Sequence, residues 1–123
     1  MSNLSGTWLG TYWQEGQPTR FEMTLVQGEN TLSGNILDDG YLGEATLAGE
    51  VIGRRISFTK TYLGGIGHSV AYTGIVAEDE DSMSGDWQIK NLVTGTWEAH
   101  RSKDDLTAEL MSRLTAKVPA GVR

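Results

Sequence analysis

Runs in which apolar and polar residues alternate one by one cover the chain from near its start to Arg101. In one of them, Phe21 and Met23 are separated by Glu22 and followed by Thr24. Alternation with a period of two is typical of a β-strand that has one buried and one exposed face. The runs predict eight strands, at about 4–14, 19–27, 31–38, 44–51, 54–62, 68–77, 82–90 and 94–101.

The segments between these runs predict how the strands are ordered. Short segments suited to tight turns alternate with segments expected to be longer loops. The tight turns are expected at 28–30, 52–54 and 78–81, and the longer loops at 15–18, 39–43, 63–67 and 91–94. This is the order of an antiparallel meander. Because closure removes exposed strand edges, the meander favours an all-β fold, an eight-stranded antiparallel up-and-down β-barrel.

Helical spacing replaces the alternation after Arg101. Leucine recurs every fourth residue, and two acidic residues stand before the first leucine, as is common at helix N-termini. These residues are Leu106, Leu110 and Leu114, and Asp104 and Asp105. We expect a barrel domain at 1–103 and a C-terminal α-helix at 104–117 that packs on the barrel or on a partner chain. A tail is expected at 118–123.

Glycines recur at interior positions of the predicted strands. Gly34, Gly49, Gly74 and Gly85 each follow a small residue and share the parity of inward-facing neighbours. An inward glycine leaves space in a narrow barrel and allows the strand to coil. The pattern therefore indicates that these glycines serve the packing of the barrel and do not form a functional motif.

Two residues at the ends of the barrel sequence are expected to close one end of it. Trp8 stands low on the first strand beside Gly6, and the last strand returns Arg101 to the same end. A guanidinium stacked on the indole would close this floor while it donates hydrogen bonds to nearby carbonyls. The motifs "GTW" (6–8) and "GTWEAHR" (95–101) resemble the signature of the calycin superfamily, which contains the lipocalin and avidin-like barrels.

The resemblance implies a cup that binds a small molecule at its open mouth. Short strands and hairpins make the chain most similar to the compact avidin-type barrel. Avidins grip biotin with an Asn and a Ser on the upper first strand, where this chain has Gly10 and Gln14. The avidin-type acidic residue late in the last strand is also missing, since Asp104 and Asp105 come only after Arg101. The resemblance therefore implies the fold, and not biotin as the ligand.

Aromatic and polar residues with interior parity gather toward the expected mouth, as in the lining of a small-molecule pocket. The candidate ligand-binding residues are Tyr12, Gln14, Asp38, Lys60, Tyr62, His68, Tyr72, Trp87 and Trp97. We expect stacking walls from four of them, Tyr12, Tyr62, Tyr72 and Trp97. A buried Lys60 needs a partner, either Asp38 or an anionic group of a ligand. In the alternative interpretation these side chains simply fill the barrel, with Lys60 at its rim.

Three function classes follow from these residues. The favoured one is a barrel that binds a small molecule, anionic or aromatic. The second is a protein-interaction or oligomerisation module, acting as a homo-oligomer through the Trp13 face or the C-terminal helix, because large apolar residues face outward. They are Leu9, Trp13, Val26, Leu37 and Ile75. The third is a cyclase- or isomerase-type enzyme using Asp38, Lys60, Tyr62 and His68. We assign no catalytic residue, because no recognised catalytic spacing is present.

Composition narrows the remaining chemistry. The chain has no cysteine, so disulfides and zinc–thiolate sites are excluded, and its net charge of -6 argues against a nucleic-acid partner. The acidic segment 77–86 lacks the spacing of a calcium loop. A haem role for His68 has no second histidine to support it, since His100 is expected outside at the opposite end. We expect no metal, no cofactor, no membrane partner and a cytoplasmic location.

Overall fold

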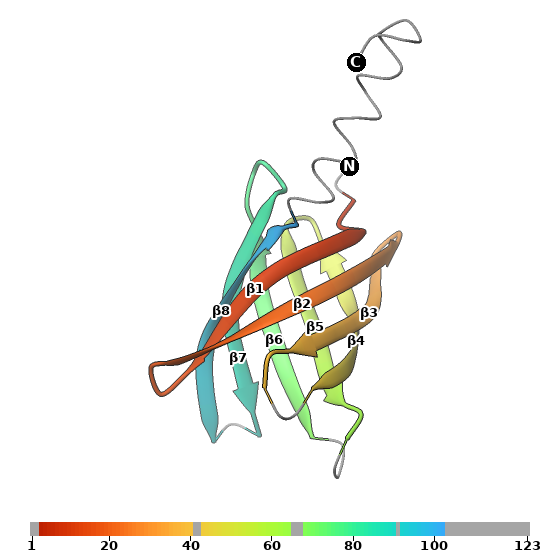
Figure 1. Ribbon diagram of the computed structural model, residues 1–123. Coiled ribbons are helices and arrows are strands. Elements are labelled where there is room, and N and C mark those ends of the chain that lie inside the picture. The colour runs from red at the N-terminus through yellow and green to blue at the C-terminus, as the bar shows by residue number, and fades with distance from the viewer. Residues whose placement is uncertain (1–2, 41–42, 65–67, 91, 103–123) are drawn as a thin grey trace, which may run out of the picture.

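The computed structural model describes residues 3–40, 43–64, 68–90 and 92–102. Its strands are β1 (Gly6–Gln14), β2 (Gln17–Gly28), β3 (Thr31–Asp38), β4 (Glu44–Ile52), β5 (Arg55–Tyr62), β6 (Ser69–Val76), β7 (Ser82–Ile89) and β8 (Val93–Arg101). They form one closed barrel in chain order, in which every neighbouring pair is antiparallel and β8 pairs with β1 (Figure 1). The predicted barrel is confirmed, and each predicted strand end lies within two residues of the observed one.

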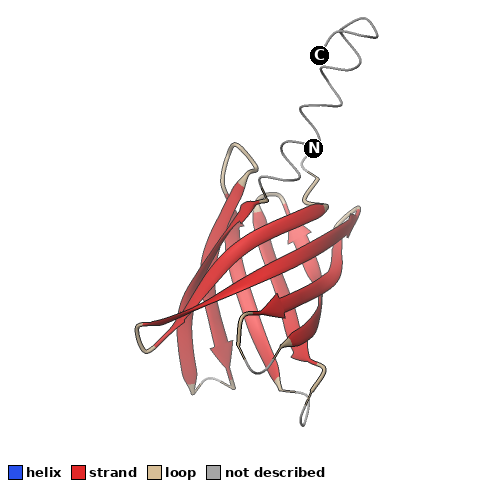
Figure 2. Cartoon of the chain, viewed as in Figure 1, coloured by secondary structure: helices blue, strands red, loops and turns tan. Residues whose placement is uncertain are grey.

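The predicted addition of a C-terminal helix is corrected. The described residues contain strands, turns and loops but no helix (Figure 2), and 104–117 and 118–123 lie outside them. A leucine spacing is a weak basis for a helix, because a segment of about 12–15 residues is only marginally helical without packing partners. The fold that the structure shows is the all-β barrel alone. Among the described residues, no helix has the length and apolar character needed to cross a membrane.

Two connections differ from the predicted kind of turn. β1 and β2 are joined by a two-residue turn, Glu15 and Gly16, whose φ angles are 50° and 79°. Positive φ at both central residues suits the twist of a tight hairpin, which is why no longer loop is needed at 15–18. The acidic segment expected to turn tightly at 78–81 instead lies in a longer connection between Val76 and Ser82.

Trp8 and Arg101 close the end of the barrel at which β1 starts and β8 ends. The indole of Trp8 is fully buried, and the Arg101 guanidinium lies 4.7 Å from the centre of its ring. The guanidinium also donates hydrogen bonds of 2.7–3.2 Å to three main-chain carbonyls, those of Asn3, Ser5 and Glu80. We call this end the floor and the opposite end the mouth.

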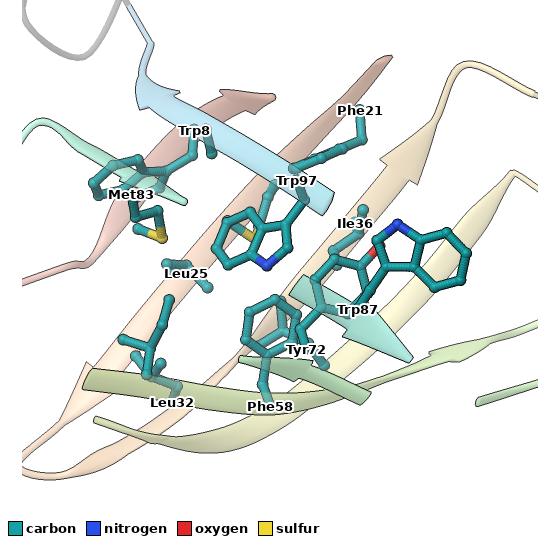
Figure 3. Close-up of a cluster of buried hydrophobic side chains, with 14 of the residues drawn as sticks. Trp8, Phe21, Leu25, Leu32, Ile36, Phe58, Tyr72, Met83, Trp87 and Trp97 are labelled. Atoms are coloured by element: carbon teal, nitrogen blue, oxygen red, sulfur yellow. The ribbon is translucent and has the colours of Figure 1, made fainter. Parts of the chain in front are cut away.

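Inward-facing side chains pack together along the barrel (Figure 3). Two of the largest, Trp87 and Trp97, lie against glycines. Gly85 pairs with Trp97 across β7 and β8, and Gly95 pairs with Trp87. A Cβ on Gly85 would lie 1.9 Å from the carbonyl oxygen of Thr73, and a Cβ on Gly95 would lie 2.5 Å from the Trp87 ring. Both indole N–H groups donate to main-chain carbonyls at 3.0 Å. Gly95 therefore gives Trp87 room against the wall. Gly74, where a Cβ would lie 2.8 Å from the Trp97 ring, does the same for Trp97, and Gly85 lets the main chain of β6 come close.

Candidate functional site

A cluster of ionisable side chains lies inside the barrel toward the mouth. Asp38 is the last residue of β3, and Lys60 and Tyr62 are near the end of β5. β4 lies between these strands and runs opposite to both, so β3 and β5 end at the same end of the barrel. All three residues share the inward parity of their strands and are buried. Tyr12, near the end of β1, completes the cluster.

Asp38 is the centre of this cluster. Its carboxylate oxygens accept hydrogen bonds of 2.8 and 3.0 Å from Lys60 Nζ, and the two side chains are 1% and 0% exposed. The hydroxyl groups of Tyr12 and Tyr62 both donate to Asp38 Oδ2, the first at 3.1 Å. A buried carboxylate held by four donor contacts has no need of a ligand to satisfy it.

Aromatic rings surround the ammonium group of Lys60. Its Nζ atom lies 4.6 Å from the ring centre of Tyr62, 4.8 Å from that of Tyr12 and 5.7 Å from that of Tyr72. A cation at these distances from aromatic faces is attracted by their quadrupoles. Tyr62 and Tyr72 are buried, whereas Tyr12 is half-buried. Of the three tyrosines around Lys60, Tyr12 is therefore the one that solvent reaches most readily.

Burial changes the acid–base properties of the cluster. It lowers the pKa of the Lys60 amino group, and the nearby Asp38 carboxylate opposes this effect. Burial, followed by the hydrogen bond to Asp38, raises the pKa of Tyr62, and burial followed by the charge of Asp38 raises that of Tyr72. The phenols thus remain donors in neutral solution. The ion pair of Lys60 and Asp38 carries no net charge.

The other predicted site residues are divided between the core and the rim. Trp87, Trp97 and Tyr72 are buried, and Tyr72 stacks on Phe58 with ring centres 4.8 Å apart and planes at 12°. Tyr72 also lies edge-on to Trp97, with ring centres 5.6 Å apart, and Trp87 lies edge-on to Tyr12 at 6.4 Å. Three of the residues expected to line a pocket thus belong to the hydrophobic core cluster. Gln14 and His68 are exposed near the mouth. The main-chain carbonyl of His68 accepts a 2.9 Å hydrogen bond from the N–H of Tyr62.

Phe21 belongs to the site and was not among the predicted residues. Its ring centre lies 6.3 Å from that of Tyr12 and 6.0 Å from Lys60 Nζ, and it pairs with Asp38 across β2 and β3. The alternation predicts that Phe21 faces inward, but the residue that pairs with it on β3 depends on the length of the turn between β2 and β3. The observed turn at 29–30 pairs it with Asp38, whereas the three-residue turn expected at 28–30 would pair it with Leu37.

The wall beside the cluster is thin at Gly10. A Cβ there would lie 2.4 Å from both Phe21 Cζ and the carbonyl oxygen of Glu98, so the Phe21 ring occupies the space of a side chain at this position. A hollow on the outer wall crosses β8, β1, β2 and β3 at the same place and is lined in part by Phe21 and Asp38. Gly10 therefore lets the aromatic side of the cluster approach the barrel surface.

Comparison with known proteins assigns no family. Neither a protein-family model nor a curated protein matches the sequence. The closed eight-stranded antiparallel barrel is consistent with a calycin-like fold, so the resemblance extends to the architecture. In the described ranges, no group of three or more histidine and acidic side chains is placed to hold a metal ion. The function must therefore be argued from the cluster itself.

Proposed function

We propose that the protein binds a small neutral aromatic molecule at the mouth of the barrel, next to the cluster of Asp38, Lys60, Tyr62 and Tyr12. The observation that carries the proposal is an ion pair with almost no exposed surface, next to a half-buried tyrosine. Replacing such a pair by apolar side chains is often neutral or stabilising, so packing alone does not require it. Buried ionisable groups with perturbed pKa values are enriched at functional sites.

Charge balance supports a neutral ligand. Lys60 is already neutralised by Asp38, so an added anion would place an uncompensated charge beside the pair, and so would an added cation. A neutral molecule leaves the balance unchanged. The expected ligand was anionic or aromatic, and an anionic ligand was the alternative to Asp38 as the partner of Lys60. Because Asp38 is that partner, the aromatic class is the one that we keep.

Tyr12 supports the position and shape of the ligand. Its ring lies 6.3 Å from Phe21 at 24° and 6.4 Å from Trp87 at 77°, and its hydroxyl is bonded to Asp38. When Tyr12 rotates toward solvent, a ligand ring takes its place against these two side chains. A hydroxyl or N–H on that ring replaces the phenol as a donor to Asp38. On binding, the ligand therefore takes over the ring contacts and the hydrogen bond that Tyr12 makes in the free protein.

A matched pair of dyes tests the proposal. Phenylnaphthylamine is neutral and carries one N–H, and anilinonaphthalene sulfonate has the same rings with an added negative charge. We expect the neutral dye to bind with increased fluorescence and the sulfonate to bind about tenfold more weakly or worse, because its charge would be buried. Tyr12→Ala should strengthen binding of the neutral dye, and Leu9→Ala on the outer wall should not change it. Equal binding of both dyes, or none, contradicts the proposal.

The alternative function classes find less support in the geometry. Leu9 and Leu37 are 47% and 52% exposed on the outer wall, but Glu22 pairs with both and stands between them. A charge at this position interrupts the apolar surface that an interaction module needs. For an enzyme, Asp38 and Lys60 could act as acid and base, but they are hydrogen-bonded to each other, and among the described residues no further group is placed to act on a substrate.

A further inference from the structure

We infer that Lys60 condenses reversibly with a neutral aromatic aldehyde in the mouth and forms a protonated imine that is paired with Asp38. The inference rests on the proposed function, because the aldehyde must first occupy the place of Tyr12. It adds a covalent step and a defined chemical class of ligand to that site.

The surroundings of Lys60 meet the needs of an imine-forming amine. A lysine must lose a proton before its nitrogen can attack a carbonyl carbon, and burial next to a proton acceptor promotes this loss. Asp38 lies 2.8 Å from Nζ and is such an acceptor. The rings of Tyr12 and Tyr62 lie within 5 Å of Nζ, so an aromatic aldehyde that displaces Tyr12 brings its carbonyl to the amine.

The reaction balances within the cluster. Asp38 takes one proton from the Lys60 ammonium, and the free nitrogen lone pair forms the new C–N bond while the C=O π electrons move to oxygen. One proton then moves from nitrogen to that oxygen, giving a neutral carbinolamine. Asp38 returns its proton to the hydroxyl group, the C–O bond breaks, water leaves and the nitrogen lone pair forms C=N. The products are water, an iminium and a carboxylate.

The charges of the buried site are the same before and after this reaction. The iminium carries the single positive charge that the ammonium carried, and Asp38 remains its counter-ion. The aromatic rings that face the ammonium also face the iminium. A site that excludes bulk water disfavours return to the aldehyde by hydrolysis.

The experiment uses the full chain, naphthaldehyde as the probe and cyanoborohydride, which reduces an iminium to a stable secondary amine. Intact mass and peptide mapping then locate the label. We expect Lys60 to be labelled about tenfold faster than the exposed Lys90, because only Lys60 has an acceptor and a ring-lined place for the aldehyde. Lys60→Arg keeps the positive charge beside Asp38 but cannot condense, so it should lose this label and keep the circular dichroism of the barrel.

Naphthalenemethanol separates the two levels of the argument, because it has the same rings but no carbonyl. If it binds and slows labelling of Lys60, both the site and the imine are supported. If it binds while Lys60 stays unlabelled, the imine is overturned and the proposed function stands. If it does not bind and Lys60 stays unlabelled, both fail. Labelling of Lys90 at the rate of Lys60 also overturns the inference, since it indicates surface chemistry alone.

Discussion

At the scale of single residues, Lys60 and Asp38 depend on each other. Either side chain alone would leave an uncompensated charge in a nearly solvent-free part of the barrel. Tyr12 and Tyr62 add donors to Asp38 but cannot replace the positive charge. The pair should therefore act as one energetic unit.

A double-mutant cycle tests this dependence. Lys60→Met and Asp38→Asn should each lower the free energy of unfolding by roughly 3–5 kcal/mol, because each leaves one buried charge unpaired. The double variant keeps an amide oxygen for the tyrosine hydroxyls and buries no charge, so it should be more stable than either single variant. Urea unfolding measures all four proteins. Additive losses in the double variant would show that the two side chains act independently.

Arg101 offers a second test at this scale. Arg101→Lys keeps a positive charge near Trp8, but an ammonium group lacks the planar set of N–H donors with which the guanidinium bonds three carbonyls. We expect the free energy of unfolding to fall by about 1–3 kcal/mol, the value of one or two lost hydrogen bonds. Arg55→Lys, at an exposed position, is the matched control and should change stability by less than about 0.5 kcal/mol. Equal effects would mean that the floor needs only a cation.

At the scale of elements, strand positions were predictable and strand neighbours were less so. Alternation is a property of one strand, and it located all eight within two residues. Register depends on turn length, where a difference of one residue exchanges the cross-strand neighbours of a side chain. This is why Phe21 was known to face inward while its pairing with Asp38 was not. The turn at Glu15 and Gly16 was likewise shorter than its composition indicated.

The pairing of glycines with tryptophans gives a prediction for β6, β7 and β8. A methyl group on Gly85 would overlap the carbonyl oxygen of Thr73 and push β6 and β7 apart beneath Trp97. Gly85→Ala should therefore lower the free energy of unfolding by roughly 1–3 kcal/mol, as overpacking does in other cores. Gly64→Ala, where a Cβ meets nothing within 4 Å, is the control and should be nearly neutral. Thermal unfolding followed by tryptophan fluorescence measures the stability of both variants. A Gly85→Ala variant as stable as the native chain would contradict this explanation.

At the scale of the whole molecule, the number and order of the strands predicted the closed barrel, but not whether its interior is open. The same parity that brought Tyr72 and Trp97 inside is shared by a pocket wall and by a packed core. The outcome depends on strand coiling and on side-chain rotamers, which no pattern along the chain specifies. The sequence did narrow the partner of Lys60 to Asp38 or a ligand, and the structure has Asp38 there.

The titration of the interior predicts how the stability of the whole barrel responds to alkali. Tyr12, Tyr62 and Tyr72 have raised pKa values in the folded state and ordinary values of 10.0 when unfolded. Above pH 10 the unfolded chain therefore releases protons that the folded chain retains, and stability falls as pH rises. Lys60 has a lowered pKa in the folded state, so it makes stability rise with pH. This effect on the slope ends above pH 10.5, the ordinary pKa of lysine, because the unfolded chain has then also lost the proton.

Above about pH 10.5, Tyr62 and Tyr72 should each lower the free energy of unfolding by about 1.4 kcal/mol per pH unit, and Tyr12 acts in the same direction. Urea unfolding at a series of alkaline pH values measures the slope. Tyr62→Phe removes one of these groups, so the slope of this variant should be smaller than that of the native chain by about 1.4 kcal/mol per pH unit, even if its stability at neutral pH is lower. A native slope near zero, or one unchanged by the substitution, would mean that the phenols ionise in the folded barrel as readily as in water.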